Sequence, residues 1–235
     1  MYKSKHISLL ILIITLTISL VFLSHWAKEI ILFKNLPKKI NSQIFYQAIS
    51  VFGTIIFLFI LRHTKKTTFK EYFQKGNVSA EILPEPTIGI KPKAKENWLH
   101  LGINFSVIIS GVTAIVIYFQ LIKGAGIAIG DVLNILPYSI VFALSNSFVE
   151  ESITRLGVVV LFKNIIKDRS IPFVSAIVFG TVHYWGNPGG ILGVIVAGFL
   201  GWFLTKSILE TKGIFWAWFI HFLQDVIIIS ALLSI

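Results

Sequence analysis

The stretch from Leu133 to Phe162 is apolar except at its centre, where it reads Ser145-Asn-Ser-Phe-Val-Glu-Glu-Ser-Ile-Thr-Arg155. Two adjacent carboxylates and a guanidinium therefore lie in a run that is otherwise suited to cross a membrane. An ionisable side chain near the middle of a membrane helix costs roughly 2.5–3.5 kcal/mol on insertion scales. Because such a cost is rarely left without compensation, we take this stretch as the functional centre.

The spacing within this stretch assigns different surroundings to the two acids. Glu151 and Arg155 are four residues apart, with the acid first, which predicts an ion pair on one helical face. Glu150 lies about 100° further round the helix, where only Asn146 and Ser147 are within reach. Its other partner must come from another segment. Glu150 is then either a base that faces a polar cavity or one member of a structural polar cluster between helices.

The composition is that of a membrane protein, because 55% of the residues are hydrophobic and only 14% are charged. The absence of cysteine excludes disulfides, thiol catalysis and cysteine-ligated metal. The formal charge is +10, and the basic residues lie between apolar runs. We interpret that charge as a sign of membrane topology and expect membrane lipid, and no nucleic acid, as a partner.

The fold class that follows is an all-α, polytopic membrane helix bundle with about seven transmembrane helices. One of the seven, Ser170–His183, is short for a crossing that needs about 20 residues. We therefore expect it to be broken or to continue irregularly into the turn 184–190. The predicted spans are Ile7–Leu23, Phe45–Leu61, Trp98–Ile122, Leu133–Phe162, Ser170–His183, Ile191–Thr205 and Ile214–Ile235.

The spans divide the chain into four parts. Residues 1–61 hold two N-terminal spans, and 62–97 form a basic cytoplasmic loop whose prolines argue against one continuous helix. Residues 98–132 hold the third span and an outer loop. Residues 133–235 form a core of four spans, which we expect to be catalytic.

The distribution of Lys and Arg sets the orientation. Fifteen of the 21 lie before the first span or in segments that this topology places on the same side of the membrane. Five lie on the opposite side, and the last is Arg155. Under the positive-inside rule, the N-terminus is cytoplasmic and the C-terminus is outside. We expect an integral, multi-pass protein of a bacterial cell membrane.

Two later spans also carry ionisable side chains, in Phe179-Gly-Thr-Val-His183 and His221-Phe-Leu-Gln-Asp225. Counted from the inner end of each span, Glu150, His183 and Asp225 lie roughly 18, 20 and 17 Å deep, at 1.5 Å per residue. His221 lies one turn shallower. The four side chains are therefore predicted to share one layer of the membrane and to converge there.

Such a cluster suits the activation of water. A carboxylate can take a proton from water, and a histidine can assist or later donate to a leaving amine. A second histidine, with an amide or an acid, can stabilise an oxyanion. Alternatively, Glu150, His183 and His221 could form a zinc site with one open position. The residues leave both possibilities open, so the expected cofactor is either none or zinc.

Three motifs carry a resemblance: Glu150-Glu151-x-x-x-Arg155, Phe179-x-x-x-His183 and His221-x-x-x-Asp225. In this order, and each in an apolar span, they resemble the motifs of the CPBP (Abi) family of intramembrane proteases. That family includes type II CAAX prenyl endopeptidases and bacteriocin-processing or self-immunity proteins. The resemblance covers the chain from about Leu133 to its C-terminus.

The resemblance implies a role for each motif residue. Glu150 and His183 would activate water, and Glu151 and Arg155 would support them. His221 and residue 225 would stabilise the oxyanion. The family often has asparagine at that last position, whereas this chain has Asp225. An ionised aspartate cannot donate a hydrogen bond, so Asp225 fits that role only if it is protonated or orients His221.

The resemblance therefore implies an intramembrane endopeptidase that cleaves a peptide or membrane-protein substrate at or near the cytoplasmic face. A bacteriocin or another small secreted peptide is the expected substrate, by analogy alone. One alternative is a non-catalytic membrane immunity or interaction protein that retains the fold. Another is a proton-coupled transporter that uses the buried acids as a relay. The oligomeric state is left open.

Small residues recur every four positions along the sixth predicted span, at Gly189, Gly193, Ala197 and Gly201. Small side chains at this spacing allow two helix backbones to approach closely. We expect them to mediate tight packing within one molecule, with a dimer face as the alternative.

Overall fold

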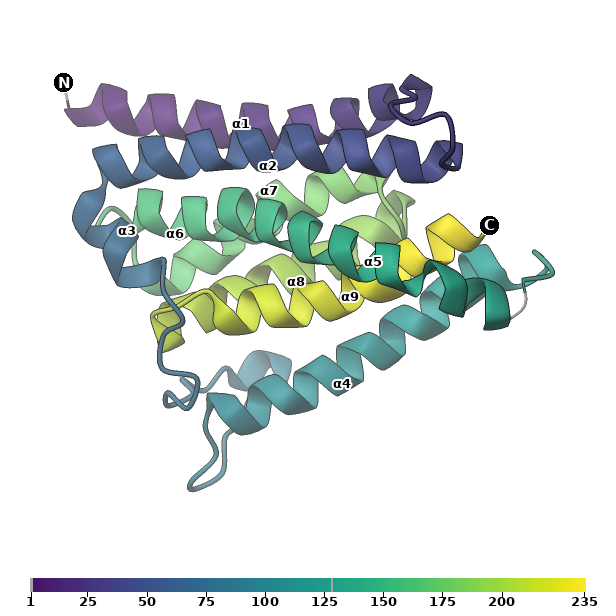
Figure 1. Cartoon of the computed structure of the whole chain (residues 1–235). Helices are drawn as coiled ribbons and strands as arrows, with labels where there is room; N and C mark the ends of the chain where they lie inside the picture. Colours follow the sequence, from purple (N-terminus) through teal and green to yellow (C-terminus); the bar gives the residue numbers. More distant parts are fainter. Residues whose placement is uncertain (1, 128) are drawn as a thin grey trace.

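A computed structural model of the chain describes residues 2–127 and 129–235, which fold as helices without any β-strand (Figure 1). The N- and C-termini lie at opposite ends of the bundle (Figure 1). The helices are α1 (Tyr2–Trp26), α2 (Lys38–Thr64), α3 (Lys66–Tyr72), α4 (Trp98–Ile117), α5 (Ile129–Glu150), α6 (Gly157–Phe162), α7 (Ile171–Val182), α8 (Gly190–Thr211) and α9 (Phe215–Ser234).

Within the described ranges, six helical stretches are long and apolar enough to cross a membrane, so the predicted number of seven is not confirmed. The exception is α7, which has 12 residues and ends in a 3-10 turn at His183–Trp185. This is the irregular end that the sequence predicts. Two helices extend beyond the predicted spans, because α2 begins at Lys38 and α8 continues past Thr205 to Thr211.

The central helix changes its winding at the charged motif. Helix α5 continues directly into a π-helical segment, Glu151–Leu156, and then into α6. π-Helical turns are rare and are found frequently at functional sites. The carbonyl of Thr154 accepts a hydrogen bond from the Ser175 hydroxyl at 2.8 Å, which ties α7 to this turn.

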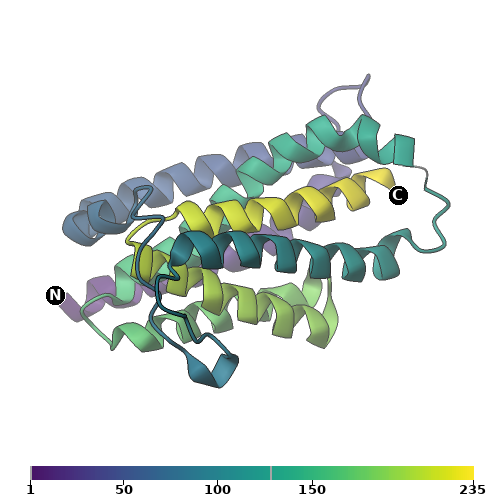
Figure 2. The same cartoon turned by 90° about the horizontal axis from the view of Figure 1, so that it is seen from below.

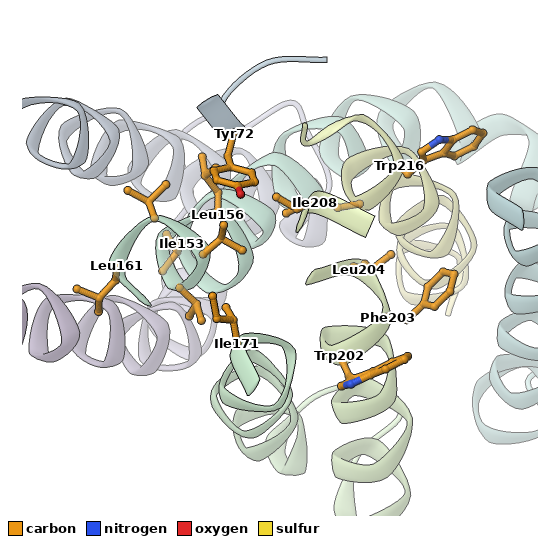
Figure 3. Close-up of a cluster of buried hydrophobic side chains, with 14 of the residues drawn as sticks. Tyr72, Ile153, Leu156, Leu161, Ile171, Trp202, Phe203, Leu204, Ile208 and Trp216 are labelled. Atoms are coloured by element: carbon orange, nitrogen blue, oxygen red, sulfur yellow. The ribbon is translucent and has the colours of Figure 1, made fainter. Parts of the chain in front are cut away.

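The two halves of the bundle are packed differently. Every residue from Glu151 to Leu161 is buried, in a large apolar core around the π-helical segment and α6 (Figure 3). That core includes Leu156, Ile171 and Ile208. The half that contains the C-terminal end of α9 has only a small cluster of buried apolar side chains, including Phe142 and Ile229. Space for a cavity therefore remains in that half.

The basic segment after α2 is a folded element, in contrast to a plain solvated linker. Helix α3 packs on the half of the bundle that holds the large apolar core, through buried Phe69 and Tyr72. Lys206 of α8 donates to the Leu83 carbonyl at 2.7 Å and pairs with Glu210 one turn further on. The indole of buried Trp98 donates to Glu210 at 2.8 Å, so one buried ion pair fixes the segment that leads into α4.

Helices α7 and α8 approach each other closely along their small residues, as the four-residue spacing predicts. A Cβ added to Gly201 would lie 3.2 Å from the Ala176 Cα, and one added to Gly180 would lie 2.9 Å from the Gly198 Cα. The small residues therefore serve packing inside the molecule. Helix α4, in contrast, lies at an angle to the bundle (Figure 1) and packs mainly on α9, beside which it runs in Figure 2.

Gly193 gives a test of this packing. A Cβ at this position would lie 2.1 Å from the Pro188 carbonyl and 2.6 Å from the His183 carbonyl. Gly193→Ala is therefore expected to destabilise the protein by about 1–3 kcal/mol, the usual cost of overpacking, and to displace the His183 turn. Thermal unfolding in detergent measures this effect. Gly111→Ala is the control, because nothing lies within 4 Å of a Cβ there; equal melting temperatures for both variants would contradict the prediction.

Candidate active site

A cavity of about 700 Å³ lies inside the bundle. Glu150, His183, His221 and Asp225 all line it, together with apolar side chains of α1, α4, α8 and α9. The depth count along the spans predicts this convergence, and the structure confirms it.

Glu150 is the acid of this cluster that is most open to the cavity. Its side chain is 17% exposed, against 7% for Asp225 and 0% for Glu151. The amide of Asn146 donates to Glu150 Oε1 at 3.1 Å, which is the contact predicted within its own helix. The partner expected from another segment is His221, whose Nε2 lies 3.6 Å from Glu150 Oε2.

Glu151 and Arg155 form a fully buried ion pair behind this surface. Arg155 Nη1 lies 3.3 Å from Glu151 Oε1, and neither side chain is exposed. The predicted pair therefore persists although the backbone between its members is π-helical. His221 Nδ1 lies 2.7 Å from the same carboxylate oxygen. A carboxylate paired with arginine can only accept, so Nδ1 donates to Glu151 and Nε2 faces the cavity.

Phe179 is the packing centre of the site, which explains why an aromatic residue precedes His183 by one helical turn. The guanidinium carbon of Arg155 lies 3.3 Å from the centre of the Phe179 ring. The rings of His183 and His221 lie 4.1 and 5.7 Å from it, centre to centre. A desolvated cation–π contact is worth about 2 kcal/mol. One side chain thus positions the arginine and both histidines.

His183 lies on the 3-10 turn at the end of α7. Its Nδ1 is 2.8 Å from the Phe179 carbonyl, which leaves Nε2 for the cavity. The resemblance implies that Glu150 and His183 act together, and both side chains line the same cavity. The ring nitrogen found beside the Glu150 carboxylate belongs to His221.

Asp225 has donors at both carboxylate oxygens. The Asn146 amide donates to Oδ2 at 3.0 Å, and His221 Nε2 lies 3.5 Å from Oδ1. In this arrangement Asp225 orients His221 and Asn146. Of the two roles that the sequence leaves open for residue 225, orientation of His221 is the one that this geometry supports.

The alternative zinc site is not supported by the donor geometry. No group of three His, Cys, Asp or Glu side chains in the part of the chain that the structure describes is arranged to hold a metal ion. The Nδ1 atoms of His221 and His183 contact Glu151 and the Phe179 carbonyl, which leaves the Nε2 atom of each ring for the cavity. Among the described residues, Glu150, His183 and His221 share a cavity but are not grouped closely enough to hold a metal ion in this structure.

The cavity extends from the acids toward one end of the bundle only. Its lining includes Thr17, Leu20, Val21 and Ser24 on α1, Ser42 on α2, and Ile228, Ile229 and Leu232 on α9. These positions lie toward the end that holds the C-terminus, away from the basic segments. With the orientation predicted from Lys and Arg, this is the outer half of the membrane, whereas the sequence led us to expect the cytoplasmic face.

The sequence analysis did not identify several polar side chains of the lining, and Tyr46 and Gln224 are two of them. Tyr46 lies near the start of the second predicted span, where an aromatic residue is typical of a membrane interface and gives no sign of a site. Gln224 precedes Asp225 and accepts a hydrogen bond from Thr113 of α4. The partner of Gln224 comes from a helix whose position in the bundle the sequence does not give.

Comparison with known proteins adds one match. Residues 132–227 match the family model described as type II CAAX prenyl endopeptidase Rce1-like. This range includes all seven residues named in the three motifs. No curated protein and no solved structure matches the chain.

Proposed function

Because residues 132–227 match the family model of type II CAAX prenyl endopeptidases, we propose that this multi-pass membrane protein hydrolyses a peptide bond with water activated by Glu150. The observation that carries the proposal is the Glu150 carboxylate, the most open acid in a mostly apolar cavity, which Asn146 and His221 hold from two sides. A carboxylate placed in this way can accept a proton from water.

The remaining polar side chains have defined tasks in this reaction. Glu150 takes a proton from the water, whose oxygen attacks the carbonyl carbon. When the C–N bond breaks, Glu150 returns the proton to the leaving amine. His221 orients Glu150 and is itself held by the Glu151–Arg155 pair. His183 presents Nε2 to the cavity, where it can contact the substrate carbonyl or the leaving group.

The apolar lining suits a substrate with an apolar segment, such as a small membrane-associated peptide of the bacteriocin type. The test compares wild type with Glu150→Gln, at matched expression, in a host that lacks the gene. Mass spectrometry of peptides from membranes and medium is expected to show products only with wild type. If the peptide profiles are the same while Glu150→Gln still protects cells from a peptide toxin, the protease proposal fails and a non-catalytic immunity role replaces it.

The side from which the substrate enters can be tested directly, because the chain has no cysteine. Single cysteines at Gln43 in the cavity and at Lys34 in the first outer loop are expected to react with a membrane-impermeant maleimide on intact cells. A cysteine at Lys167, in the basic connection before α7, is expected to react only after the membrane is opened. The reverse pattern would show that the cavity opens to the cytoplasm.

A further inference from the structure

The proposed hydrolysis needs a donor for the carbonyl oxygen, which becomes negative when water attacks. Preorganised donors at this position are among the largest contributions to catalysis. Asp225 accepts from Asn146 and lies beside His221, and the Asn146 amide is shared between Glu150 and Asp225. The Gln224 amide nitrogen is directed at Ser110 and the Ile220 carbonyl. None of these three groups is therefore free to donate to the substrate, which leaves the Nε2 atoms of His183 and His221 and any further hydroxyl in the cavity lining as donors.

Tyr46 of α2 has a hydroxyl that meets this need. Its side chain is buried and lines the same cavity as Glu150 and Asp225. Helix α2, which carries Tyr46, packs against α5, which carries Glu150. No hydrogen bond joins the hydroxyl to another side chain or carbonyl among the residues that the structure describes, and the hydroxyl is not one of the fully buried atoms without a partner, so it faces the cavity. An unpaired hydroxyl that faces a cavity can donate a hydrogen bond to a ligand bound there.

We propose that Tyr46 is a catalytic residue whose hydroxyl donates a hydrogen bond to the substrate carbonyl oxygen during hydrolysis. In this step the water oxygen bonds to the carbonyl carbon, the π electrons move to the oxygen, and the water proton passes to Glu150. Tyr46 keeps its own proton and stabilises the oxyanion until the C–N bond breaks. This inference rests on the proposed function.

The proposal gives the N-terminal helices a part in the chemistry. Tyr46 lies outside the segment 132–227 that matches the protease family. Helix α2 packs against α5, which carries Glu150, and so brings the phenol to the acid. The site is then incomplete without a residue that this chain supplies from its second helix. The hydroxyl also compensates for Asp225, an acceptor at the position where the related motif often has asparagine.

The test is Tyr46→Phe, which removes the hydroxyl and keeps the ring. We expect kcat to fall about 10²–10³-fold, the usual effect of removing one oxyanion donor. KM and the melting temperature should stay close to those of wild type. Tyr138→Phe is the matched control, because Tyr138 is an exposed phenol on α5 that does not line the cavity. An unchanged kcat for Tyr46→Phe would overturn the proposal.

Two further measurements separate a chemical role from a structural one. A fluorinated tyrosine at position 46 lowers the pKa of the phenol and should shift the alkaline limb of the kcat profile to lower pH, which a packing role would not do. An unmoved limb would also overturn the proposal, even if Tyr46→Phe failed to fold. Glu150→Gln distinguishes failure of the proposed role of Tyr46 from failure of the proposed function. If that variant is inactive while Tyr46→Phe is fully active, only the role of Tyr46 fails; if Glu150→Gln keeps full activity, the proposed function fails.

Discussion

Glu150→Gln is expected to reduce kcat by about 10²–10⁴-fold, the range that a positioned general base contributes. The substitution keeps the size of the side chain, and its oxygen can still accept the hydrogen bond that Asn146 donates to Glu150 Oε1. It removes the ability to take a proton from water. KM is expected to change little, because the carboxylate acts on water and not on substrate binding. The measurement is steady-state cleavage by purified protein of a peptide identified in the cellular profile.

The control for this experiment is Glu29→Gln. Glu29 is a surface acid whose side chain is 76% exposed and pairs only loosely with Lys38. That variant should keep wild-type kcat, and both variants should keep the wild-type melting temperature. A Glu150→Gln protein that is well folded and cleaves at the wild-type rate would contradict the role of Glu150 as a base.

The second large effect is expected on stability, at the ion pair of Glu151 and Arg155. Both side chains are completely buried, and Arg155 Nε and Nη2 and Glu151 Oε2 have no hydrogen-bond partner in the described part of the chain. Removing one member of a buried pair leaves an uncompensated charge and costs about 3–5 kcal/mol. Glu151→Leu and Arg155→Met should each lower the free energy of unfolding by this amount.

The double variant Glu151→Leu/Arg155→Met is expected to be more stable than either single variant, because no lone charge remains. It should nevertheless be inactive, since the Nδ1 of His221 loses its acceptor. Denaturant titration in detergent micelles, followed by tryptophan fluorescence, measures these free energies. The exposed pair of Lys38 and Glu29 is the control and should contribute no more than about 1 kcal/mol. Additive losses at the buried pair would contradict the predicted coupling.

The sequence by itself determined what depends on helix geometry alone. The spacing of Glu151 and Arg155 predicts their ion pair, and that of Asn146 and Glu150 predicts the hydrogen bond between them. The small residues of α8 predict its close contact with α7. Such contacts follow from 3.6 residues per turn and from the direction of each span. They also survive the π-helical winding at Glu151–Leu156, which the sequence did not predict.

Only the tertiary structure decided how the helices meet across space. It placed His221, in preference to His183, beside the Glu150 carboxylate, and it brought Tyr46 into the cavity from the second helix. It placed a large apolar core in one half of the bundle and only a small apolar cluster, beside the cavity, in the other. The reason is that hydrophobic burial has no direction. The order of spans along the chain does not say which faces pack together, whereas an i, i+4 contact needs no partner from elsewhere.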